Sequence, residues 1–346
     1  MIVNAYAILD AFVSLLRLGL GLLVVALGLF AWRLWRRSAL HAEERETLEN
    51  RCHLLLLLAS VLLWLNVASW PIFYLLLQSY VPEWPGVMCI YGVTRIGSHG
   101  IGISRWLPPL LAALQVMKPA LIFLSGAWFV LHLIDRRTRT APLLGRVLLL
   151  LSGAGLLAVA DAASETAYLL IPKKEEYLSA GCCVGVFDEE AGPSRFLPKT
   201  WIGDANSTWL DAVYYTANIG MVLILAMFVR RPRLGRGGML FLLLAALLTL
   251  VVSATFLVES AAPRLIHMPN HHCVYDLVPR APESLIAVAL FLIGSLAVGW
   301  ACVAAWLGAG PESTAFLPET IGRLLHLSCL AYLGSLTILS VELLLA

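Results

Sequence analysis

The segment MLFLLLAALLTLVVSATFLV, residues Met239–Val258, contains no charged side chain. At about 1.5 Å per residue, a helix of roughly 20 such residues crosses the roughly 30 Å hydrocarbon core of a membrane. Because backbone polar groups in lipid must be satisfied within their own segment, these residues predict a membrane-spanning helix.

Seven further segments have the same character. Hydrophobic residues make up 60% of the chain and charged residues 13%, against roughly half and a quarter in soluble proteins. We therefore expect an all-α, polytopic integral membrane protein with about eight transmembrane helices, forming a single transmembrane helical domain over residues 1–346. The predicted spans are 8–32, 52–78, 108–134, 146–171, 209–229, 239–258, 284–307 and 322–345.

Basic residues are unevenly distributed between the connecting loops. Short linkers after the first, third and fifth spans are rich in Arg, and Arg323 follows the linker after the seventh, whereas the longer loops 79–107, 172–208 and 259–283 contain fewer basic residues. The positive-inside rule therefore places both termini and the three longer loops on the non-cytoplasmic side. We expect a bacterial inner (plasma) membrane with these loops in the periplasm. Their Pro, Gly, Asn and Asp content predicts irregular structure.

Cysteine occurs in all three of these outer loops, as Cys89, as the pair Cys182-Cys183, and as Cys273. Disulfides persist in an oxidising compartment. Because adjacent cysteines rarely pair with each other, Cys182 and Cys183 would each pair with Cys89 or Cys273. The four residues are therefore candidates for structural disulfides or for redox-active thiols.

Histidines offer a second interpretation of the same loops. His267, His271 and His272 closely precede Cys273, and His99 lies in the first loop. Imidazole together with thiolate suits zinc or copper, so these five residues are candidate metal ligands and copper or zinc the candidate cofactor. The sequence contains neither a Cys-x-x-Cys motif nor a zinc-finger spacing, which argues against both metal binding and thiol exchange.

Three charged residues lie deep within the predicted spans. Lys118 and Asp161 are each about ten residues, or ~15 Å, from the outer ends of their spans, and Glu165 shares a helix face with Asp161. Because a lone charge at this depth costs several kcal/mol, we expect Lys118 to pair with both carboxylates. Arg17 either joins this set or extends to the membrane surface. The cluster either fixes the helix register or relays protons or cations.

Three functions follow from these features. The first is metal handling, or assembly of a respiratory or exported partner, through the Cys/His face. The second is a membrane thiol–disulfide oxidoreductase. The third is an ion- or proton-coupled transporter or permease subunit that uses Lys118, Asp161 and Glu165. The sequence leaves open whether the protein is an enzyme, since no phosphate-binding loop and no His-Glu-x-x-His or Gly-x-Ser-x-Gly motif occurs.

The expected partners are the lipid bilayer and other membrane or periplasmic proteins. No basic stripe with interleaved aromatic residues occurs, so nucleic acid is not an expected partner.

Overall fold

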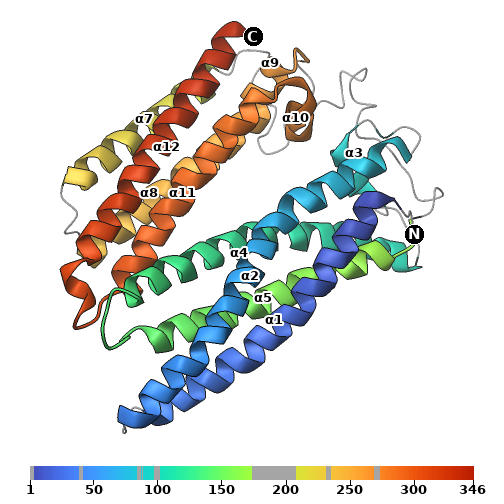
Figure 1. The fold of residues 1–346 in the computed structure, drawn as a ribbon. Helices are drawn as coiled ribbons and strands as arrows, with labels where there is room; N and C mark the ends of the chain where they lie inside the picture. The colour runs from blue at the N-terminus through green and yellow to red at the C-terminus, as the bar shows by residue number, and fades with distance from the viewer. Residues whose placement is uncertain are drawn as a thin grey trace. The chain divides into compact units, whose positions relative to one another are not determined.

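The computed structural model describes residues 4–38, 42–83, 87, 89–96, 102–173, 208–230, 235–268 and 273–346. These residues form helices and connecting turns, and no strand occurs among them. Eight of the helices are long and apolar enough to cross a membrane. The predicted all-α, multi-pass membrane protein is therefore confirmed (Figure 1).

Each long helix overlaps one predicted span, usually extending beyond it. The helix α2 begins at Ala42, so the polar segment before the second span belongs to the same helix. The eight helices are α1 (Ala5–Ser38), α2 (Ala42–Tyr80), α4 (Leu107–Asp135), α5 (Leu144–Leu170), α7 (Thr208–Arg230), α8 (Arg236–Phe256), α11 (Glu283–Leu307) and α12 (Leu317–Leu345).

Large apolar side chains on these helices face outward. Phe12 on α1 is 60% exposed, Val116 on α4 is 71% exposed and Leu248 on α8 is 65% exposed. Contiguous apolar surface of this kind is avoided by proteins that face water. Contact with the lipid bilayer accounts for it.

The chain forms two compact units. Unit 1 consists of Met1–Ala180 and Gly310–Glu312, and unit 2 consists of Gly181–Ala309 and Ser313–Ala346. Unit 1 contains α1, α2, α4 and α5, and unit 2 contains α7, α8, α11 and α12. The single transmembrane domain expected from the sequence stays a prediction.

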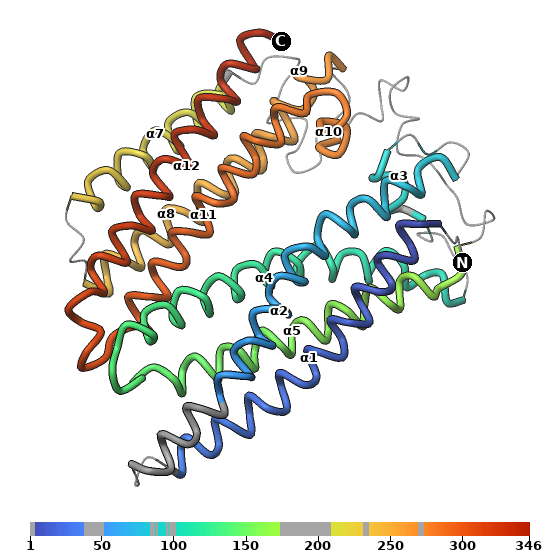
Figure 2. Tube along the Cα trace, viewed as in Figure 1, coloured from blue at the N-terminus to red at the C-terminus, as the bar shows by residue number. Residues whose placement is uncertain are grey.

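Small residues bring the helices of unit 1 close together. The helix α1 packs along both α2 and α5, and α4 packs along α5 (Figure 2). A Cβ atom added to Gly21 of α1 would lie 3.3 Å from the Gly155 carbonyl oxygen of α5, and one added to Gly28 would lie 2.6 Å from Ser152 Oγ. Close backbone approach at small residues is how helices commonly pack in lipid, where no hydrophobic force drives them together.

Unit 2 is held by a comparable contact and by neutral hydrogen bonds. The helices α11 and α12 meet at Gly294, where Ser328 Oγ donates to the Gly294 carbonyl oxygen at 2.8 Å. The helices α7 and α8 are joined by Asn218 Nδ2, which donates to Ser253 Oγ at 3.0 Å. These bonds satisfy polar groups that lipid could not.

Short helices occupy the described parts of two predicted outer loops. The first loop contains α3 (Ile90–Arg95) and a 3-10 turn at Gly102–Trp106. In the third, a π-helical turn at Leu257–Ala261 leads from α8 into α9 (Ala262–Leu265), and α10 (Leu277–Arg280) precedes α11.

Candidate functional site

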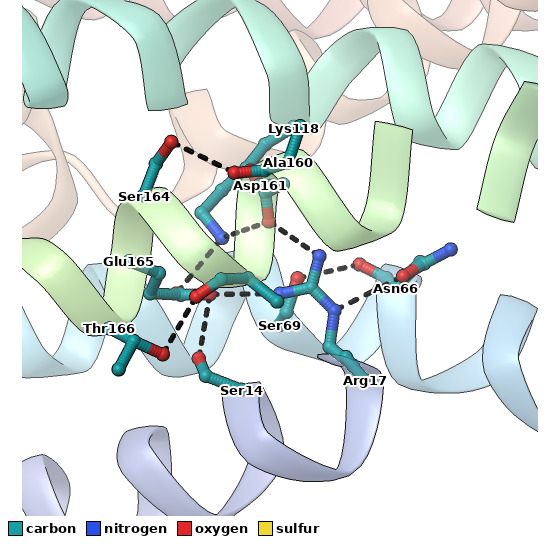
Figure 3. A network of polar contacts seen from close by, with 11 residues as sticks. Ser14, Arg17, Asn66, Ser69, Lys118, Ala160, Asp161, Ser164, Glu165 and Thr166 are labelled. Carbon is teal, nitrogen blue, oxygen red and sulfur yellow. Dashed lines mark hydrogen bonds and ion pairs between the residues drawn. The ribbon is translucent and has the colours of Figure 1, made fainter. Parts of the chain in front are cut away.

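Charged side chains from three helices meet inside unit 1 (Figure 3). Arg17 comes from α1, Lys118 from α4, and both Asp161 and Glu165 come from α5. Their side chains are between 0% and 3% exposed. The structure thus brings together the three charges that the sequence predicts to pair, and Arg17 joins them instead of extending to the surface.

Arg17 is bonded through all three nitrogens of its guanidinium group. Its Nη1 donates to Glu165 Oε2 at 2.8 Å, and its Nη2 donates to Asp161 Oδ2. Its Nε donates to Asn66 Oδ1 of α2 at 3.1 Å. The rigid, planar fork of an arginine suits this simultaneous binding, which a lysine could not reproduce.

Lys118, on α4, contacts the same two carboxylates of α5. Its Nζ donates to Glu165 Oε1 at 3.0 Å and to Asp161 Oδ2 at 3.3 Å. The same Nζ lies 4.9 Å from the centroid of the Phe73 ring. Each carboxylate therefore lies between two cations, and this pairing offsets much of the cost of removing them from water.

The local sequence explains how these side chains come to face one another. Asp161 and Glu165 are four residues apart on α5, so they lie on one face of the helix. On α1, Ser14 and Arg17 are three residues apart, and Ser14 Oγ donates to Glu165 Oε2 at 2.9 Å. The close approach of α1 and α5 makes these two faces meet.

The cluster lies deep in the predicted membrane. Lys118 is eleven residues from the start of α4 and Asp161 is nine residues from the end of α5, which correspond to about 16 Å and 14 Å along the helix axes. Both distances are close to half of the roughly 30 Å hydrocarbon thickness. Ionisable groups at this depth commonly belong to ion or proton pathways.

A fifth charged residue, Asp10, was missed by the sequence interpretation. It is 1% exposed, and its Oδ2 is buried without a hydrogen-bond partner among the described residues. Asp10, Ser14 and Arg17 are spaced i, i+4 and i+7, so they form one polar stripe along α1. This spacing is the signal that could have revealed Asp10, which lies close to the start of the first predicted span.

The predicted cysteine and histidine sites are only partly described. Cys89 precedes α3, Cys273 precedes the turn Val274–Asp276, and both are buried. His267 follows α9 with a positive φ of 58°. No disulfide forms among the cysteines within the described ranges. The metal, redox and disulfide interpretations stay predictions, because Cys182, Cys183, His99, His271 and His272 lie outside the described residues.

The charged cluster is thus the predicted site whose geometry the structure describes in full. Two bases and three carboxyl groups, shielded from water, can hold or release a proton, because any change in protonation alters the charge balance of the whole group. Comparison of the chain with protein-family models, with curated proteins and with solved structures gives no match.

Proposed function

We propose that this protein is a proton-coupled transporter or permease subunit whose proton pathway includes the charged cluster of unit 1, formed by Asp10, Arg17, Lys118, Asp161 and Glu165. The observation that carries the proposal is the burial of all five side chains. Replacing a buried ion network by apolar residues is often neutral or stabilising. The network is therefore poorly explained by stability alone, and a role in moving charge accounts for it better.

The composition of the cluster supports a proton as the coupling ion. Its two bases already contact Asp161 and Glu165 at 2.5–3.3 Å. A bound metal cation would be repelled by Arg17 and Lys118 at short range, because the interior of a membrane protein screens charge weakly. A proton adds one charge without requiring a cavity or a ligand shell.

Charge movement after a pH jump tests the proposal directly. Proteoliposomes that contain the full-length protein are adsorbed to a solid-supported membrane, and the external pH is changed rapidly. We expect a transient current from the wild-type protein, since a proton that enters a buried site crosses part of the membrane field. The current should be lost in Glu165→Gln and reduced in Asp161→Asn.

Asp211→Asn provides the matched control. Asp211 lies on α7 in unit 2, where its partly exposed carboxylate pairs with Arg264 at 3.0 Å, so its replacement should leave the current unchanged. Helix content and elution as a single species check that each variant is folded. A wild-type current no larger than that of protein-free liposomes would exclude the proposed function.

A further inference from the structure

Buried polar atoms without hydrogen-bond partners continue from the charged cluster along α4. In the cluster, Asp161 Oδ1 and Asn66 Nδ2 have no partner among the described residues, although both side chains also bond to Arg17. On α4 the same holds for Ser125 Oγ and Trp128 Nε1, in residues that are 5% and 1% exposed. Lipid cannot satisfy such groups, and leaving them unbonded costs stability.

Ser125 and Trp128 belong to a polar stripe on one face of α4. Counted from Lys118 as position i, the stripe continues at i+7, i+10, i+14 and i+17 with Ser125, Trp128, His132 and Asp135. At 3.6 residues per turn, these positions fall within about 100° of one another. His132 is partly buried and the other four are buried. The stripe therefore extends over about 25 Å, from the cluster to the end of the helix.

The far end of the stripe is ordered by contacts with its neighbours. The ring centroids of Trp128 and His132 lie 5.0 Å apart with an interplanar angle of 11°, so the two rings are stacked. Asp135 Oδ1 accepts a hydrogen bond from the Leu143 backbone N–H at 2.8 Å, across the turn that joins α4 to α5. Arg136, which begins that turn, is exposed. The stripe thus ends at the surface of unit 1.

Asn66 and Ser125 lie at a similar depth in unit 1. The helices α2 and α4 pack together and run in opposite directions (Figure 1), and Lys118 Nζ contacts the Phe73 ring. Asn66 precedes Phe73 by seven residues on α2. Ser125 follows Lys118 by seven residues on α4, so both positions lie about 10 Å nearer the α4–α5 turn. Asn66, which is bonded to Arg17, thus supplies a polar group between the cluster and Ser125.

Water suits the hydrogen-bonding character of these groups. The Trp128 indole can only donate, the Asn66 amide nitrogen can only donate, and the Ser125 hydroxyl can donate and accept. A water molecule accepts from such donors and still donates onward, and waters buried in proteins typically bond to about three polar groups. Positions three apart on a helix are neighbours, so one water can reach both Ser125 and Trp128.

We propose that ordered water along this face of α4 forms a proton path between the α4–α5 turn and the charged cluster, where Asp161 Oδ1 is the acceptor. The proposal deepens the proposed function and rests on it for the biological role of the path. Ser125 and Trp128 position the water. His132 passes protons, because a neutral imidazole accepts at one ring nitrogen and donates from the other.

The transfer conserves protons at every step. A proton that binds one ring nitrogen of His132 is balanced by the proton that leaves the other nitrogen for a water molecule. Each water along the stripe breaks one O–H bond as it forms another. Asp161 Oδ1 gains the last proton, and the charge of the cluster rises by one.

Exchange of the Trp128 indole proton for a deuteron tests whether water is present. The full-length protein, labelled with ¹⁵N-tryptophan in lipid nanodiscs, is transferred to D₂O, and the Trp128 signal is identified by its absence in Trp128→Phe. We expect the wild-type signal to exchange, and Ser125→Ala to slow this exchange about tenfold, the equivalent of one hydrogen bond to the water. The remaining tryptophan signals show that each variant is folded.

Ser152→Ala is the matched control. Ser152 is also a buried serine of unit 1, but its Oγ already donates to the Leu148 carbonyl oxygen at 2.8 Å. Its replacement should leave the exchange of Trp128 at the wild-type rate. A wild-type Trp128 signal that does not exchange, or equal rates in Ser125→Ala and the wild-type protein, would overturn the water path.

The part played by His132 is tested by the rise of the pH-jump current. His132→Phe keeps an aromatic ring beside Trp128 but removes the nitrogens that exchange protons. We expect the current to rise at least about tenfold more slowly, because a proton carrier is lost, with the total charge moved unchanged. His326→Phe, at an exposed position of α12 in unit 2, is the control. A current that rises as fast in His132→Phe as in His326→Phe would exclude His132 from the path.

The two proposals can fail separately. The expected exchange rates of Trp128 together with no pH-jump current would support the water path and exclude the proposed transport function. A pH-jump current together with exchange that is unaffected by Ser125→Ala would support transport and overturn the path along α4.

Discussion

Unit 1 and unit 2 each contain four membrane-spanning helices, but their interiors satisfy polar groups differently. In unit 1, four charged side chains from α1, α4 and α5 are bonded to one another inside the helix bundle. Unit 2 also buries the carboxylic acid Glu259, but neutral hydrogen bonds, such as Asn218 to Ser253 and Ser295 to Tyr332, join its spans. Its ion pair between Asp211 and Arg264 is partly exposed.

The difference teaches that helix packing alone does not require a buried cluster of acids and bases in this protein. Unit 2 packs its helices with small residues, aromatic contacts and neutral hydrogen bonds, and unit 1 uses similar small residues between α1 and α5. Since the two units share their packing chemistry, the charged cluster is the feature of unit 1 that still needs an explanation. A role in proton movement supplies one.

The largest expected effect comes from removing the arginine at the centre of the cluster. Arg17→Met deletes three hydrogen bonds and leaves three carboxyl groups with one base, so we expect a loss of about 3–5 kcal/mol in the free energy of unfolding. Tyr332→Phe in unit 2 should cost about 1 kcal/mol. Equilibrium unfolding in mixed detergent micelles measures both, and equal costs would contradict the contrast between the units.

The next effect concerns packing and should be similar in both units. A Cβ atom at Gly21 would lie 2.8 Å from Val159 Cγ2, and one at Gly294 would lie 2.9 Å from Tyr332 Cδ2. We expect Gly21→Ala and Gly294→Ala each to destabilise the protein by about 1–3 kcal/mol in the same unfolding assay. Gly19→Ala is the control, because no atom lies within 4 Å of its added Cβ. If Gly19→Ala costs as much, crowding is not the cause.

A smaller effect is expected from pH at the end of unit 1. Burial lowers the pKa of Lys173 from 10.5 to about 8. Between these values the unfolded chain binds more protons than the folded protein, so stability should rise with pH by at most about 1 kcal/mol per pH unit. Lys173→Met should remove this rise. The free energy of unfolding of the wild-type protein and of Lys173→Met is measured below pH 8 and between pH 8 and 10.5. The same pH dependence in both proteins would contradict the assignment.

The smallest effect is expected for a neutral bond in unit 2. A double-mutant cycle of Asn218→Leu and Ser253→Ala should give a coupling energy of about 0.6 kcal/mol, which is typical of hydrogen bonds between membrane helices. The same cycle for Arg17 and Asp161 in unit 1 should give a clearly larger value. Comparable coupling energies would show that the ion pair in unit 1 is no stronger than a neutral hydrogen bond in unit 2.

Much of the fold could be predicted from hydropathy, and the eight spans are confirmed. The charged cluster was only partly accessible. Lys118, Asp161 and Glu165 could be grouped because a short turn joins their spans and lone charges in lipid require partners. The part played by Arg17 was left open, and Asp10 was overlooked, because both depend on α1 packing against α5, a helix three spans away in sequence.

The sequence by itself determined that the chain spans the membrane, and where. That property is local, because each span must satisfy its own backbone hydrogen bonds and present apolar side chains to lipid. Only the tertiary structure decided that the polar stripe of α1 meets the two carboxylates of α5 opposite Lys118. Which helices become neighbours depends on close contacts such as those at Gly21 and Gly155, and hydropathy does not record them.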